Sequence, residues 1–184
     1  GGGIAGISAA ARLAPKGKTL VLEAETALAY HASGRSAALF EPFYGAPSVN
    51  ELSLAGENYF RNAHGGVLSN RGIMIIARTG EEAQLKNEVA SFRMNHITVN
   101  EAVALIPILD ASVLTQAAIS NNAEDIDTDL LIQNFARDAR ANGTEIQTKA
   151  PVTAIKKTKN GWVISSGEYQ VETKIVINAA GAWA

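Results

Sequence analysis

Three glycines at the start of the chain have a spacing that permits phosphate binding. Gly1, Gly3 and Gly6 fit the pattern G-x-G-x-x-G, and the alanine-rich segment 4–13 predicts a buried helix behind them. The first glycine of such a pattern allows a tight turn, the second lets a pyrophosphate approach the backbone, and the third lets helix and strand pack closely. Unpaired N–H groups and a positive dipole at the helix start would attract phosphates. Taken alone the pattern is not specific, because glycine-rich helix starts also serve packing.

A carboxylate after the next apolar segment makes the pattern more specific. The run 20–22 (LVL) is typical of a parallel strand buried on both faces, and Glu23 follows it directly. A carboxylate there can accept hydrogen bonds from both ribose hydroxyls and would repel a 2′-phosphate. The alternative is that Glu23 is a surface acid like Glu25. Glycines, helix, strand and acid together favour a dinucleotide site. We therefore expect the first strand of a nucleotide fold before Gly1, and both ends of the chain look truncated.

The segment after this strand favours one dinucleotide. Residues 25–47 lack regular periodicity, are rich in small residues, and carry Arg35 within the stretch YHASGRSAALFEPFYG. A loop of this length is usually functional or disordered. Small residues let the backbone pack closely on a flat ligand. This composition suits FAD, because the protein has to contact its long pyrophosphate–ribityl chain as far as the flavin ring.

The remaining sequence predicts an α/β fold with an added antiparallel piece. Ser48 is expected to cap a helix that ends near Arg61, with Glu51 completing a capping box. Further helices are expected at 79–93, 100–106 and 127–143, the last with Leu130, Leu131, Phe135 and Ala139 along one side. Strands are expected at 72–78, 115–120, 144–148, 152–157, 162–166, 168–172 and 173–181, with a hairpin turn at Asn160-Gly161.

Composition excludes several classes of function. The 184 residues suffice for one ordinary globular domain, and the formal net charge of -2 leaves no basic stripe for nucleic acid. No apolar run is long enough for a membrane span. Cysteine is absent, which excludes disulfides, thiolate metal sites and a cysteine nucleophile within this stretch.

Three aspartates have the alternate spacing of a calcium loop. Asp125, Asp127 and Asp129 are followed by Leu130 where the loop needs glycine, and by Ala136 where it needs a bidentate glutamate. Helix capping explains the acids. We therefore expect no metal site.

Four blocks of sequence resemble the D-amino acid oxidase (DAO) superfamily of FAD-dependent oxidoreductases. They are GGGIAGISAA, VLEAE, HASGRSAA and the terminal VINAAGAWA, and they occur in the family's order over the whole chain. Within the family, YHASGRSAALFEPFYG together with DIDTDLL most resembles the bacterial D-amino acid dehydrogenases of the D-arginine dehydrogenase-like branch. The resemblance implies a Rossmann-like, glutathione-reductase-type FAD domain at 1–65 and 125–184 with an antiparallel β-meander. It also implies part of an inserted α+β substrate domain at 66–124.

The resemblance also implies a set of ligand-binding residues. Besides the three glycines, Ala5, Glu23 and Ala24 would lie against the adenosine and pyrophosphate, and the backbone of Val152 would meet adenine. The pyrophosphate, the ribityl chain and one side of the flavin would be wrapped by Ala32, Ser33, Gly34, Arg35, Ser36, Ala37, Ala38 and Leu39. Three small residues would close over the cofactor: Ala179, Ala180 and Gly181. Tyr44 would lie on a loop that covers the substrate.

The family's reaction is implied in the same way. Hydride transfer to flavin N5 would oxidise a D-amino acid to an imino acid, which water hydrolyses to the 2-oxo acid and ammonia. The family holds the substrate carboxylate with an arginine and a tyrosine from a half that this chain lacks, so we name no catalytic residue here. The expected partners are an amino acid and an electron acceptor such as oxygen or a quinone. The expected location is the cytoplasm or the inner face of the membrane.

Two residues leave alternatives open. In the D-arginine-acting branch an acid suited to a guanidinium stands where this chain has Ile73, so we expect a neutral or apolar substrate side chain. Ile73 could equally be part of the core. His31 precedes ASGRS, a context similar to that of covalently bound flavin in some amine dehydrogenases of the superfamily, but a histidine hydrogen-bonded within the loop is favoured.

Three other functions remain open from the sequence. A glycine or sarcosine oxidase and a flavin-dependent 2-hydroxy acid dehydrogenase would use the same nucleotide fold. A non-catalytic FAD-binding fragment is the alternative from another class.

Overall fold

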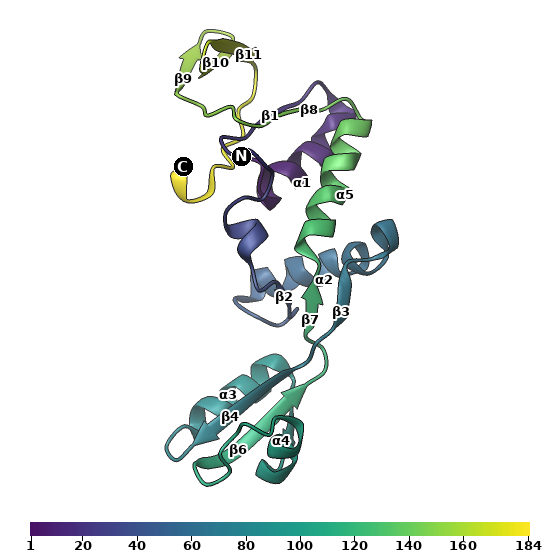
Figure 1. Cartoon of the computed structure of the whole chain (residues 1–184), viewed down its shortest axis with the longest axis vertical. Coiled ribbons are helices and arrows are strands. Elements are labelled where there is room, and N and C mark those ends of the chain that lie inside the picture. Colours follow the sequence, from purple (N-terminus) through teal and green to yellow (C-terminus); the bar gives the residue numbers. More distant parts are fainter. The chain divides into compact units, whose positions relative to one another are not determined.

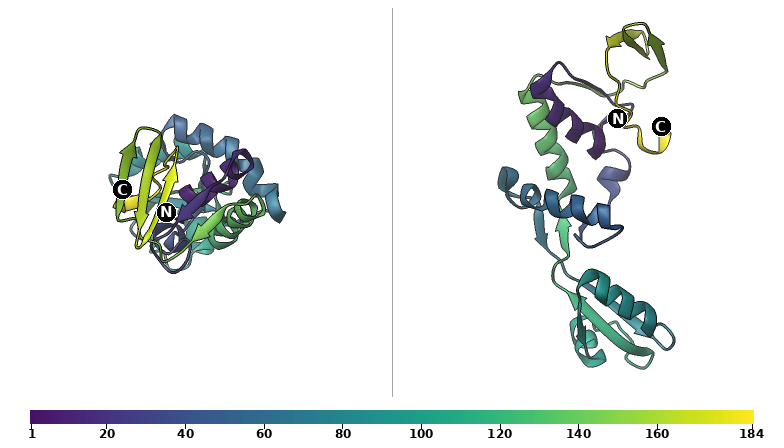
Figure 2. Two further views of the ribbon diagram at one scale, coloured as in Figure 1. Left: turned by 90° about the horizontal axis from the view of Figure 1, so that it is seen from above. Right: turned by 180° about the vertical axis from the view of Figure 1, so that it is seen from behind.

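Small side chains bring two helices together in this chain, whose computed structural model describes residues 1–184. Helix α1 (Ile4–Leu13) and helix α5 (Thr128–Ala141) lie side by side in all views (Figures 1 and 2). Alanines on both helices let their backbones approach closely, and larger apolar residues fill the remaining space. The buried side chains include Ile7, Ala10, Ala11, Leu131, Ile132, Phe135, Ala136 and Ala139.

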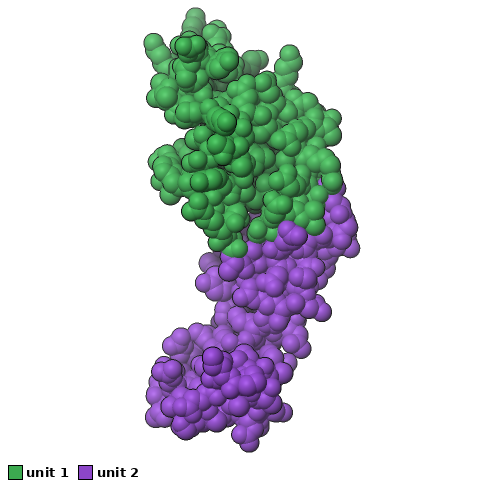
Figure 3. Space-filling view, viewed as in Figure 1, with its two compact units in different colours: residues 1–36, 128–184 green, residues 37–127 purple.

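The chain folds into two units, which Figure 3 shows in different colours. Unit 1 consists of residues 1–36 and 128–184, and unit 2 of residues 37–127. Each unit combines helices with strands, so the α/β class is confirmed. None of the helices combines the length and the apolarity that crossing a membrane requires.

Unit 1 has two small sheets. Strand β1 (Leu20–Leu22) pairs in parallel with β8 (Glu145–Gln147). The second sheet is the expected antiparallel meander (Figure 1), formed by β9 (Ala154–Thr158), β10 (Gly161–Ser166) and β11 (Tyr169–Thr173). Its first hairpin turns at Lys159-Asn160, one residue before the expected Asn160-Gly161, because Gly161 already pairs with Thr158 as the first residue of β10.

Unit 2 has two three-stranded antiparallel sheets. In the first, β7 (Glu124–Ile126) lies between β2 (Leu39–Phe40) and β3 (Leu68–Asn70). In the second, β6 (Leu114–Ser120) lies between β4 (Ile73–Arg78) and β5 (Asn95–Ile97).

Three helices belong to unit 2: α2 (Pro47–Asn62), α3 (Glu82–Phe92) and α4 (Val99–Leu105). Helix α3 packs on β4 and β6, and the buried cluster between them consists of Ala77, Leu85, Met94 and Ala118. Short 3-10 turns complete the two units at Ala14–Lys16, Ala32–Arg35, Ala63–Gly65 and Gly181–Trp183.

Two expected helix features are wrong. Helix α2 is capped by Ala46 and begins at Pro47, so Ser48 is not the N-cap. Proline is well suited to the first helical position because its φ is fixed and its missing N–H would have no partner there. Leu130 is 39% exposed, and Ile132 takes the buried position on α5.

The strand predictions also need correction. Residues 173–181 do not form the expected strand beyond Thr173, because no neighbouring strand supplies hydrogen bonds to them. In β1 only Val21 is buried, whereas Leu20 and Leu22 are half-buried, so the strand is not covered on both faces as expected. Four short strands were not expected at all: β2, β3, β5 and β7.

The α1–α5 interface should dominate the stability of unit 1. Replacing Ile132, which is 1% exposed, by alanine leaves a cavity between the helices and should lower the free energy of unfolding by about 2–5 kcal/mol. The control Leu130→Ala, on the exposed side of the same helix, should cost much less. Urea unfolding of both variants measures the difference. Equal losses would contradict the observed orientation of α5.

Glu41 should make the stability of unit 2 depend on pH. The residue is 5% exposed; its Oε1 accepts the Phe43 N–H at 3.2 Å, and its Oε2 has no partner. Burial raises the pKa of this carboxyl above its ordinary 4.5, and the Phe43 hydrogen bond opposes the rise. Because the folded state binds this proton more tightly than the unfolded chain does, the stabilisation is present at low pH. It is lost as the pH rises through the raised pKa.

Glu41→Gln keeps the shape of the side chain without its charge. We expect this variant to melt at a higher temperature than the wild type at about pH 8, with the difference vanishing at about pH 4. Thermal unfolding across this range measures the effect, with the exposed Glu51→Gln as the control. A difference that does not depend on pH would exclude a charged, buried Glu41 as its cause.

Candidate functional site

The start of helix α1 offers backbone donors to a ligand. The first bond within the helix runs from the Ile7 N–H to the Gly3 carbonyl at 3.1 Å, so the N–H groups of Ala5 and Gly6 precede the helical ladder. The Ile4 N–H is already used, because it donates to Ser33 Oγ at 3.0 Å. No acidic side chain occupies the first turn. This end of the helix is therefore suited to an anion.

The glycines permit backbones to meet at this point. A Cβ on Gly1 would collide with the carbonyl of Ala179, and one on Gly6 would collide with the carbonyl of Gly1. A Cβ on Gly34 would collide with the carbonyl of Ala29. Glycine at these three positions brings the helix start and the segment at Ala179 into contact, and folds residues 29–34 back on themselves. Gly3 differs, because a Cβ there would meet only Ser33 Oγ, at 3.1 Å.

Glu23 lies beside this helix end. Its Oε2 accepts the N–H of Gly2, and its Oε1 accepts the N–H of Glu25 at 2.9 Å. A carboxylate has about four lone-pair positions, so two remain for a ligand. The carbonyl of Glu23 also accepts the N–H of Ala150 at 2.8 Å, which brings the segment that leads to Val152 alongside.

Unit 1 therefore assembles most of the residues predicted to bind the cofactor. The glycines, Ala5, Glu23, Ala24, residues 32–36, Val152 and residues 179–181 all belong to it. Many of these side chains are small and exposed, and Val152 is 44% exposed. Free N–H groups, a carboxylate and small exposed residues together fit an extended dinucleotide. Ala37, Ala38 and Leu39 belong to unit 2, as do Tyr44 and Ile73.

His31 is the centre of a cluster that the sequence did not reveal. Its Nε2 lies 2.8 Å from Glu25 Oε1, in agreement with a histidine hydrogen-bonded in the loop. Its ring packs on Trp183 with centroids 4.3 Å apart, and Tyr30 meets it edge-on. The Arg35 guanidinium lies over Tyr30. The cluster ties the predicted FAD loop to the end of the chain.

In unit 2 the two predicted substrate residues are connected through Phe92. The Tyr44 ring stacks on Phe92, with centroids 5.9 Å apart and planes 11° apart. Phe92 and Ile73 both pack against the buried cluster between α3 and the sheet. Ile73 is half-buried, so part of its side chain belongs to the core and part remains open. Its role towards a substrate stays a prediction.

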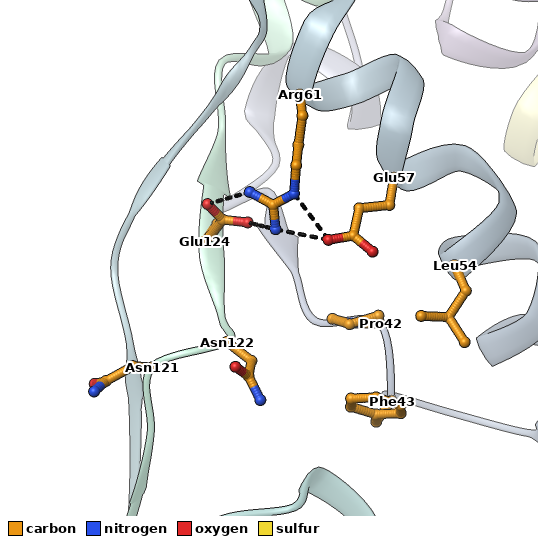
Figure 4. A pocket seen from close by; sticks show the side chains of 8 residues that line it. All are labelled: Pro42, Phe43, Leu54, Glu57, Arg61, Asn121, Asn122 and Glu124. Carbon is orange, nitrogen blue, oxygen red and sulfur yellow. Dashed lines mark hydrogen bonds and ion pairs between the residues drawn. The ribbon is translucent and has the colours of Figure 1, made fainter.

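Unit 2 contains a pocket of about 200 Å³ that the sequence did not predict. Figure 4 shows the side chains that line it. Arg61 is held there between two acids, with Nε 2.8 Å from Glu57 and Nη1 2.9 Å from Glu124. These hydrogen bonds, the one to Glu124 foremost, raise the pKa of the guanidinium above its already high ordinary value. The remaining lining consists of Pro42, Phe43, Leu54, Asn121 and Asn122. Because Arg61 is already neutralised, it does not offer a free cation to a carboxylate ligand. Only the i,i+4 spacing of Glu57 and Arg61 on α2 could have indicated this pair.

Solved structures share this fold. Glycine oxidase from Geobacillus kaustophilus matches all of this chain and 54% of its own, with a TM-score of 0.83 and 22% identity. L-proline dehydrogenase from P. horikoshii matches all of this chain and 52% of its own, with a TM-score of 0.82 and 21% identity. The FAD-bound L-alpha-glycerophosphate oxidase from Mycoplasma pneumoniae matches 92% of this chain and 48% of its own, with a TM-score of 0.77 and 19% identity. The chain spans about half the length of these proteins.

The amino-acid sequence also matches a known protein family. A family model described as FAD dependent oxidoreductase matches residues 1–184. The resemblance read from the four sequence blocks is thereby confirmed at the level of the family, whose cofactor is FAD. This chain therefore belongs to the DAO family of FAD-dependent oxidoreductases.

Proposed function

We propose that this chain is part of an enzyme that oxidises a D-amino acid to its imino acid, with bound FAD as the electron acceptor of this step. The observation that carries the proposal is the meeting of the open α1 start, Glu23 and the small residues 179–181 within unit 1. We assign residues 1–65 and 125–184 to the FAD-binding part and residues 66–124 to the substrate-binding part.

Each group of residues has a distinct task in this proposal. The N–H groups of Ala5 and Gly6 stabilise the pyrophosphate, and Glu23 accepts hydrogen bonds from a ribose. Arg35 adds a positive charge beside the phosphates. Bound FAD supplies a ring that accepts a hydride from the carbon bearing the amine. The protein orients that carbon and excludes water above it, which is the task of the loop that carries Tyr44.

An amino acid is the substrate class that the comparisons support best. Glycine oxidase, L-proline dehydrogenase and L-amino acid deaminase from Proteus are among the proteins of similar fold. The D-configuration is supported by the sequence stretch around Arg35 and Tyr44. The apolar side chain of Ile73 argues for a neutral substrate, because a buried cationic head without a carboxylate partner is costly.

A second candidate is the oxidation of glycine or a secondary amine. It is favoured by two glycine oxidases and an iminodiacetate oxidase among the proteins of similar fold. In either case the reduced flavin has to pass its electrons to an acceptor such as oxygen or a quinone. We propose a location in the cytoplasm or at the inner face of the membrane, on the strength of the family resemblance alone.

Glu23 provides a direct test of the cofactor site. Glu23→Gln removes the charge that accepts ribose hydroxyls, and a hydrogen bond to a charged group contributes about 1.5–3 kcal/mol. We therefore expect FAD to bind about 10- to 100-fold more weakly, as measured by quenching of flavin fluorescence on titration. Glu25→Gln, two residues away, is the control and should retain most of the affinity. Equal losses would place the ribose elsewhere.

The substrate is tested by anaerobic reduction of the flavin. With the longest natural form of the protein reconstituted with FAD, neutral D-amino acids should bleach the visible flavin band, whereas L-amino acids and D-arginine should not. Bleaching by glycine or sarcosine alone would support the second candidate. A bound flavin that only 2-hydroxy acids reduce, or that nothing reduces, would overturn the amino acid proposal and leave the cofactor assignment intact.

A further inference from the structure

Two consecutive residues of the loop between β2 and α2 contact two consecutive residues at the end of α3. The Tyr44 ring stacks on Phe92. The guanidinium of Arg93 lies 4.0 Å from the centroid of the Phe43 ring, well within the range of a cation–π contact. These side chains come from elements that are distant in the sequence but belong to the same unit. The paired contacts therefore hold one particular loop against one particular helix end.

We propose that the corner Phe92–Arg93 is the anchor that positions loop 41–46, and with it Tyr44, over the substrate. Phe92 and Arg93 act as positioning residues, because they contact the loop and not the reacting atoms. The inference deepens the proposed function and rests on it, since Tyr44 is the residue expected to cover the substrate.

The conformation of Arg93 supports a role for its side chain. Arg93 ends α3 in the left-handed region, with φ 52° and ψ 45°, and the following Met94 N–H donates to Val89 at 3.0 Å. Glycine is the usual residue at such a helix end, because it adopts this conformation without strain. An arginine here bears a backbone cost, and its guanidinium forms no ion pair in this structure. The contact with Phe43 is the interaction that its side chain makes.

Loop 41–46 is fixed both by hydrogen bonds within it and by its contact with Phe92. From within, the carbonyl of Glu41 accepts the Tyr44 N–H at 3.1 Å, and Glu41 Oε1 accepts the Phe43 N–H at 3.2 Å. Gly45 follows with φ 107°, a conformation in which a side chain would be strained. Tyr44 is 66% exposed. One face of the ring is thus fixed by Phe92, while the rest of the side chain stays accessible to a ligand.

The contact also connects the loop to the rest of the predicted substrate site. Phe92 packs on the same buried cluster as Ile73, the residue expected to set substrate polarity. A rigid path of packed side chains therefore runs from the sheet that carries Ile73 through Phe92 to Tyr44. Loss of the anchor should change how well the loop retains a substrate more than it changes the reaction itself.

The variant Arg93→Gly tests the role of the arginine side chain apart from the role of the helix end. Glycine keeps the left-handed cap, so the free energy of unfolding should be no lower than that of the wild type. The loop loses its cation–π contact. We expect hydrogen–deuterium exchange of the amides in 41–46 to become about three- to tenfold faster, because such contacts contribute energies of that order. Arg93→Lys keeps a cation and should restore slow exchange. Arg78→Ala, an exposed arginine of the same unit, is the matched control.

The kinetic measurement uses the FAD-loaded protein and its best amino acid substrate. Arg93→Gly should raise KM about three- to tenfold and leave kcat within about twofold. This pattern is expected when the bound substrate and the transition state lose the same binding energy. Arg93→Lys should restore KM.

The outcomes separate the anchor from the function it serves. Unchanged exchange of 41–46 in Arg93→Gly would overturn the anchor, whatever the activity. Faster exchange with an unchanged KM would show that the loop is anchored there but does not cover the substrate, which also overturns the proposal. A wild-type protein whose flavin no amino acid or amine reduces would instead overturn the proposed function, and the exchange experiment would still decide whether Arg93 holds the loop.

Discussion

The arrangement of unit 1 depends on a steric constraint at the start of α1, where backbones approach so closely that no side chain fits between them. Gly1 faces the carbonyl of Ala179, and Gly6 faces the carbonyl of Gly1. Any larger residue at either position would push the helix away from the segment it meets. At the same helix start the N–H groups of Ala5 and Gly6 stay open, while that of Ile4 donates to Ser33 Oγ. The helix start therefore combines close packing with a capacity to receive phosphates.

Charge is distributed differently in the two units. In unit 1 an open helix end and Arg35 face outward, while Glu23 is held by two backbone N–H groups and keeps acceptor positions free. In unit 2 the prominent cation, Arg61, is enclosed by Glu57 and Glu124. A guanidinium matched by two carboxylates stabilises the structure around it but has little left for an anionic ligand. This difference accords with the proposed cofactor site in unit 1.

The aromatic side chains of the loops are fixed by partners on other elements. His31 is held between Glu25 and Trp183, and Tyr44 lies on Phe92. Loop residues acquire a defined position only when such contacts offset the entropy of ordering them. Both loops are stretches in which the sequence has no periodicity, so their order comes from tertiary contacts.

The sequence by itself determined the elements whose signals are local. The spacing of apolar residues and the glycines predicted α1, the long helix α5 and the meander, whose first hairpin turns one residue earlier than expected. The four family blocks predicted the family and its cofactor. The tertiary structure decided what depends on distant partners. Leu39 becomes a strand because it pairs with Asp125, whereas 174–181, with the composition of a strand, has no neighbour to pair with. The contacts of Tyr44 and Arg93 likewise join elements far apart in the chain, and no local pattern encodes which distant residues will meet.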